Sequence, residues 1–209
     1  MGVFFCKFRF ANRAGNDARQ LSRCAGYLCA VHESLRVWIN SGYLRFAEGG
    51  LAAVRIEAMA RDTGISKSSF YHHFADLDVF FEALCTYHLE QAAIIAEKEA
   101  ACTSIDPDLI EVLTEHRTDL LFNRQLRVLR DDPVFGRCLR DADAAMGDGF
   151  VDLWQRDLKL PVTPEQLRAL FGLAIENFFL QLTPEHLNRE WLSAYFKHLR
   201  LVVKTAAGR

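Results

Sequence analysis

The sequence lacks the features that mark a membrane-spanning or exported protein. No apolar run approaches the roughly 18 to 20 residues that a helix needs to cross a bilayer. The apolar cluster at residues 3–6 is followed by Lys7 and Arg9 and is too short for the core of a signal peptide. These absences favour a cytoplasmic protein.

Signals for a metal or a cofactor are also missing. The cysteines form no Cys-x-x-Cys pair, and no histidine partner stands at zinc spacing, so we expect free thiols in a reducing compartment. His72 and His73 are adjacent, and on a helix they would point about 100° apart, which makes a shared ion unfavourable. We expect neither a metal nor a cofactor. The cysteines are Cys6, Cys24, Cys29, Cys85, Cys102 and Cys138.

Catalytic motifs do not stand out either. The sequence has no Gly-rich phosphate loop, no nucleophile motif, no spaced carboxylate pair and no alternation of strand and helix patterns. What it has is 209 residues, half of them apolar, which is enough for a sizeable core in one or two domains. We therefore expect an all-α protein that is not an enzyme, with an enzyme as the rival class.

Charge is distributed unevenly along the chain. Residues 1–74 carry ten Lys and Arg against five Asp and Glu, whereas residues 75–209 carry fifteen against twenty-two. Neutralisation of phosphates supplies much of the affinity of proteins for DNA, and an acidic remainder discourages non-specific binding. The basic N-terminal part is therefore the candidate DNA-binding region.

Residues 55–74, RIEAMARDTGISKSSFYHHF, organise the rest of the sequence. Ile56, Met59 and Ala60 recur at the spacing that places apolar side chains on one face of a helix. Gly64 stands where that helix would end, because glycine enters the left-handed conformation without a Cβ penalty. Ser66 is then the expected N-cap of a second helix, its hydroxyl accepting from an amide two or three residues later.

The second helix is polar. Phe70 and Phe74, at i and i+4, are its expected core anchors, and the remaining side chains are small or hydrogen-bonding. This is a helix-turn-helix pattern, in which the second helix presents its N-terminal residues to base edges in the major groove.

Residues 33–81 resemble the N-terminal domain of the TetR family of bacterial transcriptional regulators. The resemblance rests on glycines, apolar spacing and a Tyr-x-x-Phe pair in one unbroken register. The matching residues are Trp38, Ile39, Gly42, Phe46, Gly50, Ile56, Met59-Ala60, Gly64-Ile65-Ser66-Lys67, Phe70-Tyr71, His73-Phe74 and Phe80.

Three positions depart from the family pattern. Arg55 replaces the usual Ser or Thr, which loses a helix cap and gains a cation for phosphate. Leu77 replaces the usual Lys and puts one phosphate contact in doubt. Ser68-Ser69 stand where many members have Gly-Thr, which we interpret as an altered base preference.

The resemblance implies a DNA-binding surface. Lys67 and Tyr71 are expected on phosphates, and Ser68, Ser69 and His72 nearest base edges. One of the two adjacent histidines is expected to contact DNA and the other to pack. The predicted DNA-binding residues are Arg55, Ser66, Lys67, Ser68, Ser69, Tyr71, His72 and His73. Two arginines on the first helix, Arg36 and Arg45, are as consistent with solvation as with phosphate contact.

We divide the chain into three parts. Residues 1–32 are expected to be a poorly ordered extension, with a basic arm along DNA as the alternative. Residues 33–81 form the predicted three-helix DNA-binding domain, and residues 82–209 a larger helical domain for effector binding and dimerisation.

Helix signals continue to the C-terminus. A first helix is expected over 34–47 and a fourth from an Asp76 cap towards Ala101. Helices are then expected from Asp106-Pro107 to about Arg130, from Asp132-Pro133 to Met146 and over 150–160. Thr163-Pro164-Glu165 and Thr183-Pro184-Glu185 each resemble a helix start, with an N-cap, a proline at N1 and an acidic first turn.

The last two helices, over about 164–182 and 184–205, are apolar on more than one face. A helix of this kind must bury one face in its own core and the other against something else. The resemblance implies a four-helix bundle with a second subunit. The alternative is a monomer that buries both faces internally.

These observations together predict a TetR-like homodimeric regulator of double-stranded DNA, a repressor released from a palindromic operator by a small-molecule effector. The alternative is a degenerate regulator that keeps a dimeric protein-interaction or ligand-binding module without DNA binding. An aromatic, nearly uncharged set of residues is the candidate effector pocket: Phe122, Phe135, Phe150, Trp154, Phe171 and Phe178.

Overall fold

The computed structural model describes residues 18–146, 149–158 and 163–206, and this part of the chain is helical with no strand. The helices of its N-terminal half are α1 (Ala18–Gly49), η1 (Leu51–Ala53), α2 (Ile56–Thr63), α3 (Lys67–His73) and α4 (Leu77–Ala101). Those of its C-terminal half are η2 (Ile105–Leu109), α5 (Ile110–Glu115), α6 (Arg117–Val128), α7 (Pro133–Met146), α8 (Gly149–Leu158), α9 (Pro164–Gln181) and α10 (Arg189–Ala206).

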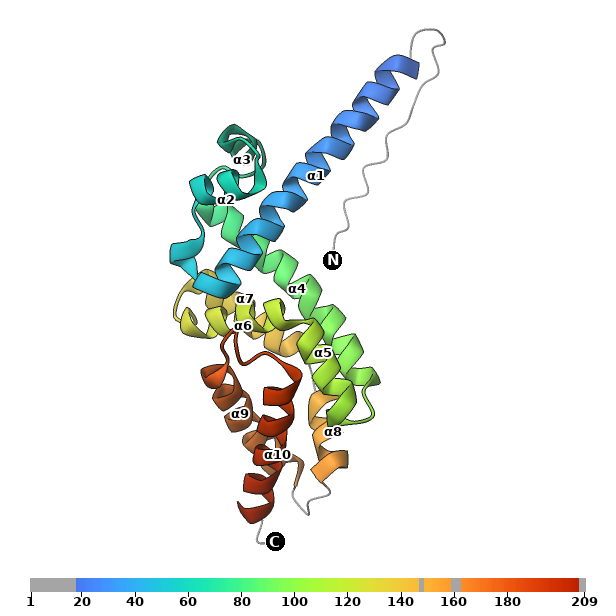
Figure 1. Ribbon diagram of the computed structural model, residues 1–209, viewed down its shortest axis with the longest axis vertical. Helices are drawn as coiled ribbons and strands as arrows, with labels where there is room; N and C mark the ends of the chain where they lie inside the picture. The colour runs from blue at the N-terminus through green and yellow to red at the C-terminus, as the bar shows by residue number, and fades with distance from the viewer. Residues whose placement is uncertain (1–17, 147–148, 159–162, 207–209) are drawn as a thin grey trace.

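The molecule is elongated, with α2 and α3 at one end and α9 and α10 at the other (Figure 1). Helix α1 begins at Ala18, well before the predicted residue 34, so part of the predicted extension continues the first helix. Residues 1–17 lie outside the described residues, so neither the expected extension nor the alternative of a basic arm is tested there. No helix among the described residues is long and apolar enough to cross a membrane.

Local sequence signals place the end of α2 and the start of α4 as predicted. Gly64 follows α2 with φ 71° and ψ 9°, the left-handed conformation that glycine adopts without strain. Asp76 caps α4, because its side chain accepts from the amide of Val79 at 2.9 Å. Ser66 is the N-cap of α3, but its side chain makes no capping hydrogen bond. The predicted role of that hydroxyl was therefore wrong.

Aromatic side chains fill the core of the N-terminal part. Phe70 and Phe74, the two predicted anchors of α3, are both buried. Phe70 meets Trp38 of α1 edge-on at 5.3 Å between ring centroids and Phe80 of α4 at 5.2 Å. Glycine at position 42 lets α1 and α4 approach, because an added Cβ would lie 2.3 Å from Cζ of Phe80. These contacts fix α3 on a rigid support.

Helices α1 and α4 also join the two ends of the molecule. Helix α4 packs along α7, and α1 packs along α6. An aromatic cluster lies at this junction: Phe122 of α6 stacks on Tyr43 of α1 at 4.3 Å between centroids and contacts Phe46 at 4.5 Å. Phe135 of α7 lies 5.3 Å from Phe46.

Two predictions for the C-terminal part were wrong. The single helix expected over 106–130 is broken at His116 (φ −95°, ψ 28°), because α6 packs on α1 and α7 whereas α5 packs on α10. It also starts earlier, at an N-cap on Ser104, and Asp106 has a non-helical conformation.

The second Thr-Pro-Glu segment forms a turn and does not begin a helix. The amide of His186 donates to the carbonyl and the hydroxyl of Thr183. Helix α10 instead begins at Arg189, where the side chain of Asn188 accepts from the amide of Trp191 at 2.9 Å. At the first such segment, Thr163 and Gln166 form the capping box that α9 requires.

Candidate functional site

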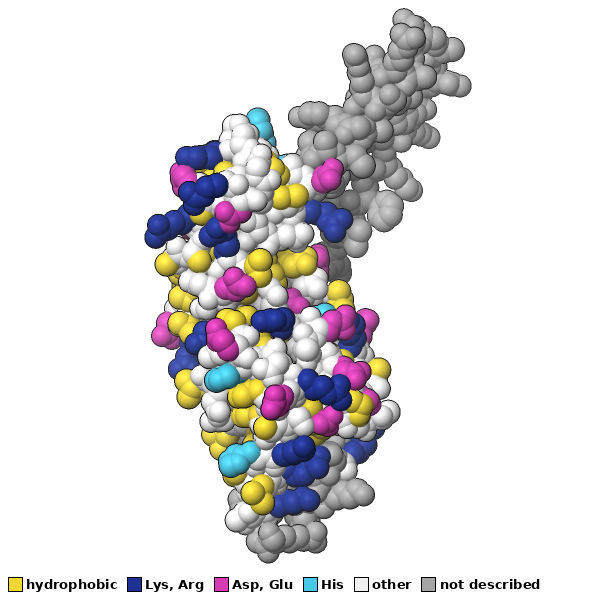
Figure 2. Space-filling view, in the orientation of Figure 1, with side chains coloured by type: hydrophobic (Ala, Val, Ile, Leu, Met, Phe, Trp, Pro, Cys, Tyr) yellow, Lys and Arg dark blue, Asp and Glu magenta, His cyan; other side chains and the backbone are white. Residues whose placement is uncertain are grey.

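One candidate site is the end of the molecule formed by α2 and α3. Lys and Arg side chains gather on the visible face of this end (Figure 2). Four residues of α3 are exposed there: Lys67, Ser68, Tyr71 and His72. The Tyr71 side chain is 60 % exposed although it is a large aromatic residue. Such exposure on a rigid helix leaves these side chains available to a partner.

The other polar residues of α3 face the protein. The indole nitrogen of Trp38, itself fully buried, donates to the hydroxyl of Ser69 at 3.4 Å. Nε2 of His73 lies 2.7 Å from the hydroxyl of Ser34 on α1. Partial burial, with the neighbouring His72, lowers the pKa of His73 below its ordinary value. Ser69 and His73 thus hold α3 against α1, and His72 is the outward-facing histidine.

Lys67 is paired with an acidic residue of α2. Its ammonium donates to Oε1 of Glu57 at 2.9 Å, and both side chains are exposed. The same contact lowers the pKa of the Glu57 carboxyl, chiefly through the hydrogen bond from Lys67. The exposed pair therefore presents a cation and a competing anion side by side. Beside it the hydroxyls of Ser66 and Ser68 lie 2.9 Å apart.

The residues that depart from the family pattern have distinct environments. Arg55 is exposed at the N-cap of α2, and its Nε donates to the carbonyl of Ala52 at 3.1 Å. Leu77 is half-buried and packs against the core at the start of α4, so its side chain contributes to packing.

Arg45 on α1 forms an ion pair with Asp62 of α2 and donates to the carbonyl of Ala53. These two contacts orient its side chain within the N-terminal part.

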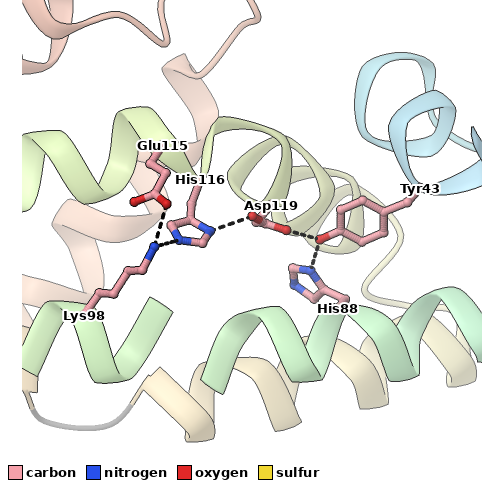
Figure 3. Close-up of polar contacts among 6 residues, drawn as sticks. All are labelled: Tyr43, His88, Lys98, Glu115, His116 and Asp119. Atoms are coloured by element: carbon pink, nitrogen blue, oxygen red, sulfur yellow. Dashed lines mark hydrogen bonds and ion pairs between the residues drawn. The ribbon is translucent and has the colours of Figure 1, made fainter. Parts of the chain in front are cut away.

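A chain of buried polar groups connects α1 with the C-terminal half (Figure 3). The Tyr43 hydroxyl donates to Oδ1 of Asp119 on α6 at 2.7 Å. Since that hydroxyl has only one proton, it accepts from Nδ1 of His88 on α4 at 2.8 Å. Burial lowers the pKa of His88 to about 4, and burial together with Asp119 raises that of Tyr43 well above its ordinary value. Both groups are therefore uncharged near neutral pH.

The chain continues on the other side of Asp119. Its Oδ2 accepts from Nδ1 of His116 at 2.9 Å, and Nε2 of His116 accepts from the ammonium of Lys98 on α4 at 3.0 Å. Lys98 also donates to Glu115 of α5 at 2.7 Å. The polar chain therefore connects four helices, α1, α4, α5 and α6. A shift of α4 would break it.

The second candidate site is a cavity of about 50 Å³ in the C-terminal half. Three of the predicted pocket residues, Trp154, Phe171 and Phe178, line it. Phe122 and Phe135 lie in the aromatic cluster at the junction of α1 with α6 and α7, apart from this cavity. The side chain of Phe150 lies outside the described part of the structure.

Sequence reasoning missed the charged residue of this cavity. Glu99 lines it, is 2 % exposed, and has no described hydrogen-bond partner for Oε2. Burial raises its pKa to about 7. On the sequence Glu99 is one of several acidic residues near the end of α4, and no spacing separates it from its exposed neighbour Glu97. Tyr195 and Phe196 of α10 also line the cavity.

A metal centre is not apparent. Within the described ranges no three His, Cys, Asp or Glu side chains are grouped closely enough to hold an ion. His72 faces outward and His73 contacts Ser34, so the two adjacent histidines do not converge.

Comparison with known sequences links the N-terminal part to regulatory proteins. Residues 45–84 match the family described as bacterial regulatory proteins, tetR family. Among curated proteins, the chain is similar to the HTH-type transcriptional repressor Rv1474c of Mycobacterium tuberculosis. The two are 26 % identical over 144 residues, covering 66 % of this chain and 75 % of that protein.

Comparison with solved structures supports the fold. The described helices resemble the crystal structure of a protein from Mesorhizobium loti assigned to the TetR family of transcriptional regulators. That match has a TM-score of 0.50 and 16 % sequence identity, and it covers 82 % of this chain and 97 % of the other. At this identity the likeness concerns the fold alone.

Proposed function

We propose that this chain, which belongs to the TetR family of bacterial regulatory proteins by its helix-turn-helix domain, is a homodimeric transcriptional repressor released from DNA by a small molecule. The observation that carries the proposal is the exposed face of α3, supported on α1 and α4 at one end of the molecule. Its place of action is the cytoplasm, where its DNA partner is found.

The exposed side chains suit the two kinds of DNA contact. Lys67 and Tyr71 would reach phosphate oxygens, as would Arg55 at the start of α2. Ser68 and His72, which have no inward-facing partner among the described residues, would lie nearest base edges. Ser69 and His73 would position α3, because their side chains already contact α1.

The pairing of Lys67 with Glu57 gives a direct test of DNA binding. A gel-shift titration against DNA upstream of its own gene, at about 50 mM salt, should show a shift by the full-length protein. Lys67→Ala should weaken binding to all sequences, because a phosphate contact is lost. Glu57→Gln should strengthen it, since the carboxylate that competes with phosphate is removed.

Two outcomes would contradict this proposal. Failure to shift any DNA at low salt would favour the alternative, a dimeric interaction module without DNA binding, which the half-buried Leu77 at a position of a usual phosphate contact supports. Equal affinities of the protein and both variants would show that Lys67 does not contact DNA.

Apolar side chains on α9 and α10 support a dimer. Leu173 is 73 % exposed and Leu180 80 % exposed, while Leu201 and Val202 of α10 are also exposed. A groove of about 610 Å³ runs between the two helices on this face. A second copy of the chain would cover it and place two α3 helices on one duplex, as a two-fold reader of DNA needs.

The dimer has its own test. Leu173→Glu and Leu180→Glu together should convert the protein to monomers in analytical ultracentrifugation and weaken DNA binding. Ile94→Glu, a matched change at an exposed position of α4, should leave the dimer intact. A monomeric wild-type protein would overturn this part of the proposal.

Effector release requires coupling between the cavity and α3. Helix α4 supplies it in this proposal, because it begins beside α3, contributes His88 and Lys98 to the polar chain, and lines the cavity through Glu99. A ligand would shift the protein to another arrangement of α4 only through its higher affinity for that arrangement.

A further inference from the structure

Glu99 places a carboxyl group without a described counter-ion in an otherwise apolar cavity. Its carboxyl is buried, and Oε2 receives no hydrogen bond from the described residues. No lysine or arginine occurs among the described residues that line the cavity. Its neighbour on α4, Lys98, donates instead to Glu115 and His116. A buried carboxyl without a partner is costly, so its position calls for an explanation beyond packing.

The walls around this carboxyl are aromatic. Phe178 and Tyr195 meet edge-on with centroids 5.4 Å apart, and Tyr195 meets Phe196 at 5.6 Å. Trp154 lies 6.4 Å from Phe196 in a similar orientation. The faces of such rings attract cations through their quadrupoles. An acidic group set among aromatic rings is complementary to a positively charged organic group.

We propose that the cavity binds a small organic ammonium ion, with Glu99 as its counter-ion and the aromatic rings around its apolar part. This assignment rests on the proposed function, since it names the chemical class of the effector. A bare metal ion fits poorly, because the lining offers one carboxyl and no cluster of ligands among the described residues. An anion would face the Glu99 carboxylate without a compensating cation.

Protonation of Glu99 gives the site a distinctive pH dependence. Burial raises its pKa to about 7, and an ammonium ion would favour the ionised form. The other titratable groups around it are Tyr195, whose pKa burial raises to about 12, and Cys102, whose pKa burial and nearby carboxylates also raise. Both stay neutral near pH 7. Between pH 8 and pH 6 the ionised fraction of Glu99, and with it the affinity, should fall about tenfold.

The test compares compounds that differ in charge and little in shape. Ethylammonium, ethanol and acetate, which are small enough for a cavity of about 50 Å³, are titrated into the full-length protein by calorimetry at pH 8, with methylammonium as a smaller cation. The two ammonium ions should bind and the alcohol and the anion should not. Failure of both cations to bind at pH 8, or equal affinity of ethanol and ethylammonium, would overturn the assignment.

A matched pair of variants tests the role of the carboxyl. Glu99→Gln keeps the shape and removes the charge, and it should lower ethylammonium affinity at least tenfold. Glu97→Gln makes the same change at an exposed position of α4 and should leave the affinity unaltered.

Binding by wild-type protein is also measured at pH 6 in two buffers of different ionisation enthalpy, which gives the number of protons released per ligand. Release of close to one proton per ligand supports Glu99 as counter-ion, and no release contradicts it even if Glu99→Gln does not fold.

A gel-shift experiment distinguishes failure of this inference from failure of the proposed function on which it rests. If ethylammonium abolishes the gel shift of the wild type but not that of Glu99→Gln, both the cation site and effector release are supported. Binding that depends on Glu99 without any effect on DNA upholds the cation site and overturns effector release through it. A DNA shift by protein that binds neither ammonium ion overturns the cation site and leaves DNA binding intact.

Discussion

Tyr43 of α1 donates a 2.7 Å hydrogen bond to Asp119 of α6, and this contact joins the helix that supports α3 to the C-terminal half. Both residues are buried, and they are 76 positions apart in the sequence. The contact lies at the centre of the polar chain that runs from His88 to Lys98 (Figure 3). Removing this hydrogen bond is the most direct way to test whether the polar chain stabilises the packing of the two halves.

Tyr43→Phe should destabilise the protein by about 1 to 3 kcal/mol, because Asp119 loses one donor and Nδ1 of His88 loses its acceptor. Urea unfolding at pH 7 measures the loss. Tyr87→Phe is the control, since Tyr87 contacts Tyr43 through its ring and has no described hydrogen bond from its hydroxyl. Equal free energies of unfolding for Tyr43→Phe and the wild type would show that the polar chain contributes little to stability.

Gly42→Ala tests the close approach of α1 and α4. The new Cβ would lie 2.3 Å from Cζ of Phe80, which is fully buried, so the two helices must separate. We expect a loss of about 1 to 3 kcal/mol in urea unfolding, with weaker DNA binding. Gly172→Ala on α9 is the matched control, because nothing lies within 4 Å of its added Cβ. That change should be neutral or stabilise by up to about 1 kcal/mol.

Ser69→Ala and His72→Ala should distinguish the residue of α3 that stabilises the domain from the residue that contacts DNA. Ser69→Ala removes the acceptor of the buried Trp38 indole and should cost on the order of 1 kcal/mol of stability. His72→Ala changes an exposed side chain and should alter stability by less than about 0.5 kcal/mol while weakening DNA binding. Unfolding and gel-shift titrations of both variants check this. Loss of stability in His72→Ala would contradict the assignment.

Glu99 should make the protein less stable as pH rises. Its folded pKa of about 7 exceeds the ordinary value of 4.5, so its contribution is fully present below pH 4.5 and is lost as pH rises through 7. Glu99→Gln should therefore gain stability over the wild type with increasing pH, on the order of 3 kcal/mol by pH 8. Urea unfolding at pH 5 and pH 8 measures the difference. A constant difference would indicate that Glu99 titrates normally.

His88 acts in the opposite direction. Its folded pKa of about 4 lies below the ordinary 6.5, so its contribution is present above pH 6.5 and is lost as pH falls through 4. The two effects oppose each other between pH 4.5 and 6.5, and Glu99→Gln should reveal a steeper loss of stability on acidification. An NMR titration of the His88 ring should give a pKa near 4. A value near 6.5 would mean that the ring is solvated.

Features that depend on a few neighbouring residues could be predicted from the sequence. Glycine at 64 ends α2, Asp76 caps α4, and Thr163 caps α9, because each signal acts within one helical turn. The buried Phe70 and Phe74 followed from their spacing. These local signals, with the polar second helix, also located the candidate DNA-binding face.

Local signals failed where a distant contact decides the outcome. The helix expected over 106–130 breaks at His116, whose ring contacts both Lys98 and Asp119. Thr183-Pro184-Glu185 has the sequence of a helix start and yet forms a turn, since Asn188 caps α10 instead.

The sequence by itself determined the helical class, the helix-turn-helix and the identity of the side chains on α3. Only the tertiary structure decided which of them face outward, because Ser69 is turned inward by Trp38, 31 residues away. It also decided that Glu99, and not its neighbour Glu97, is buried among aromatic rings. Burial depends on contacts between helices that are distant in the chain, and these leave no mark in the spacing of adjacent residues.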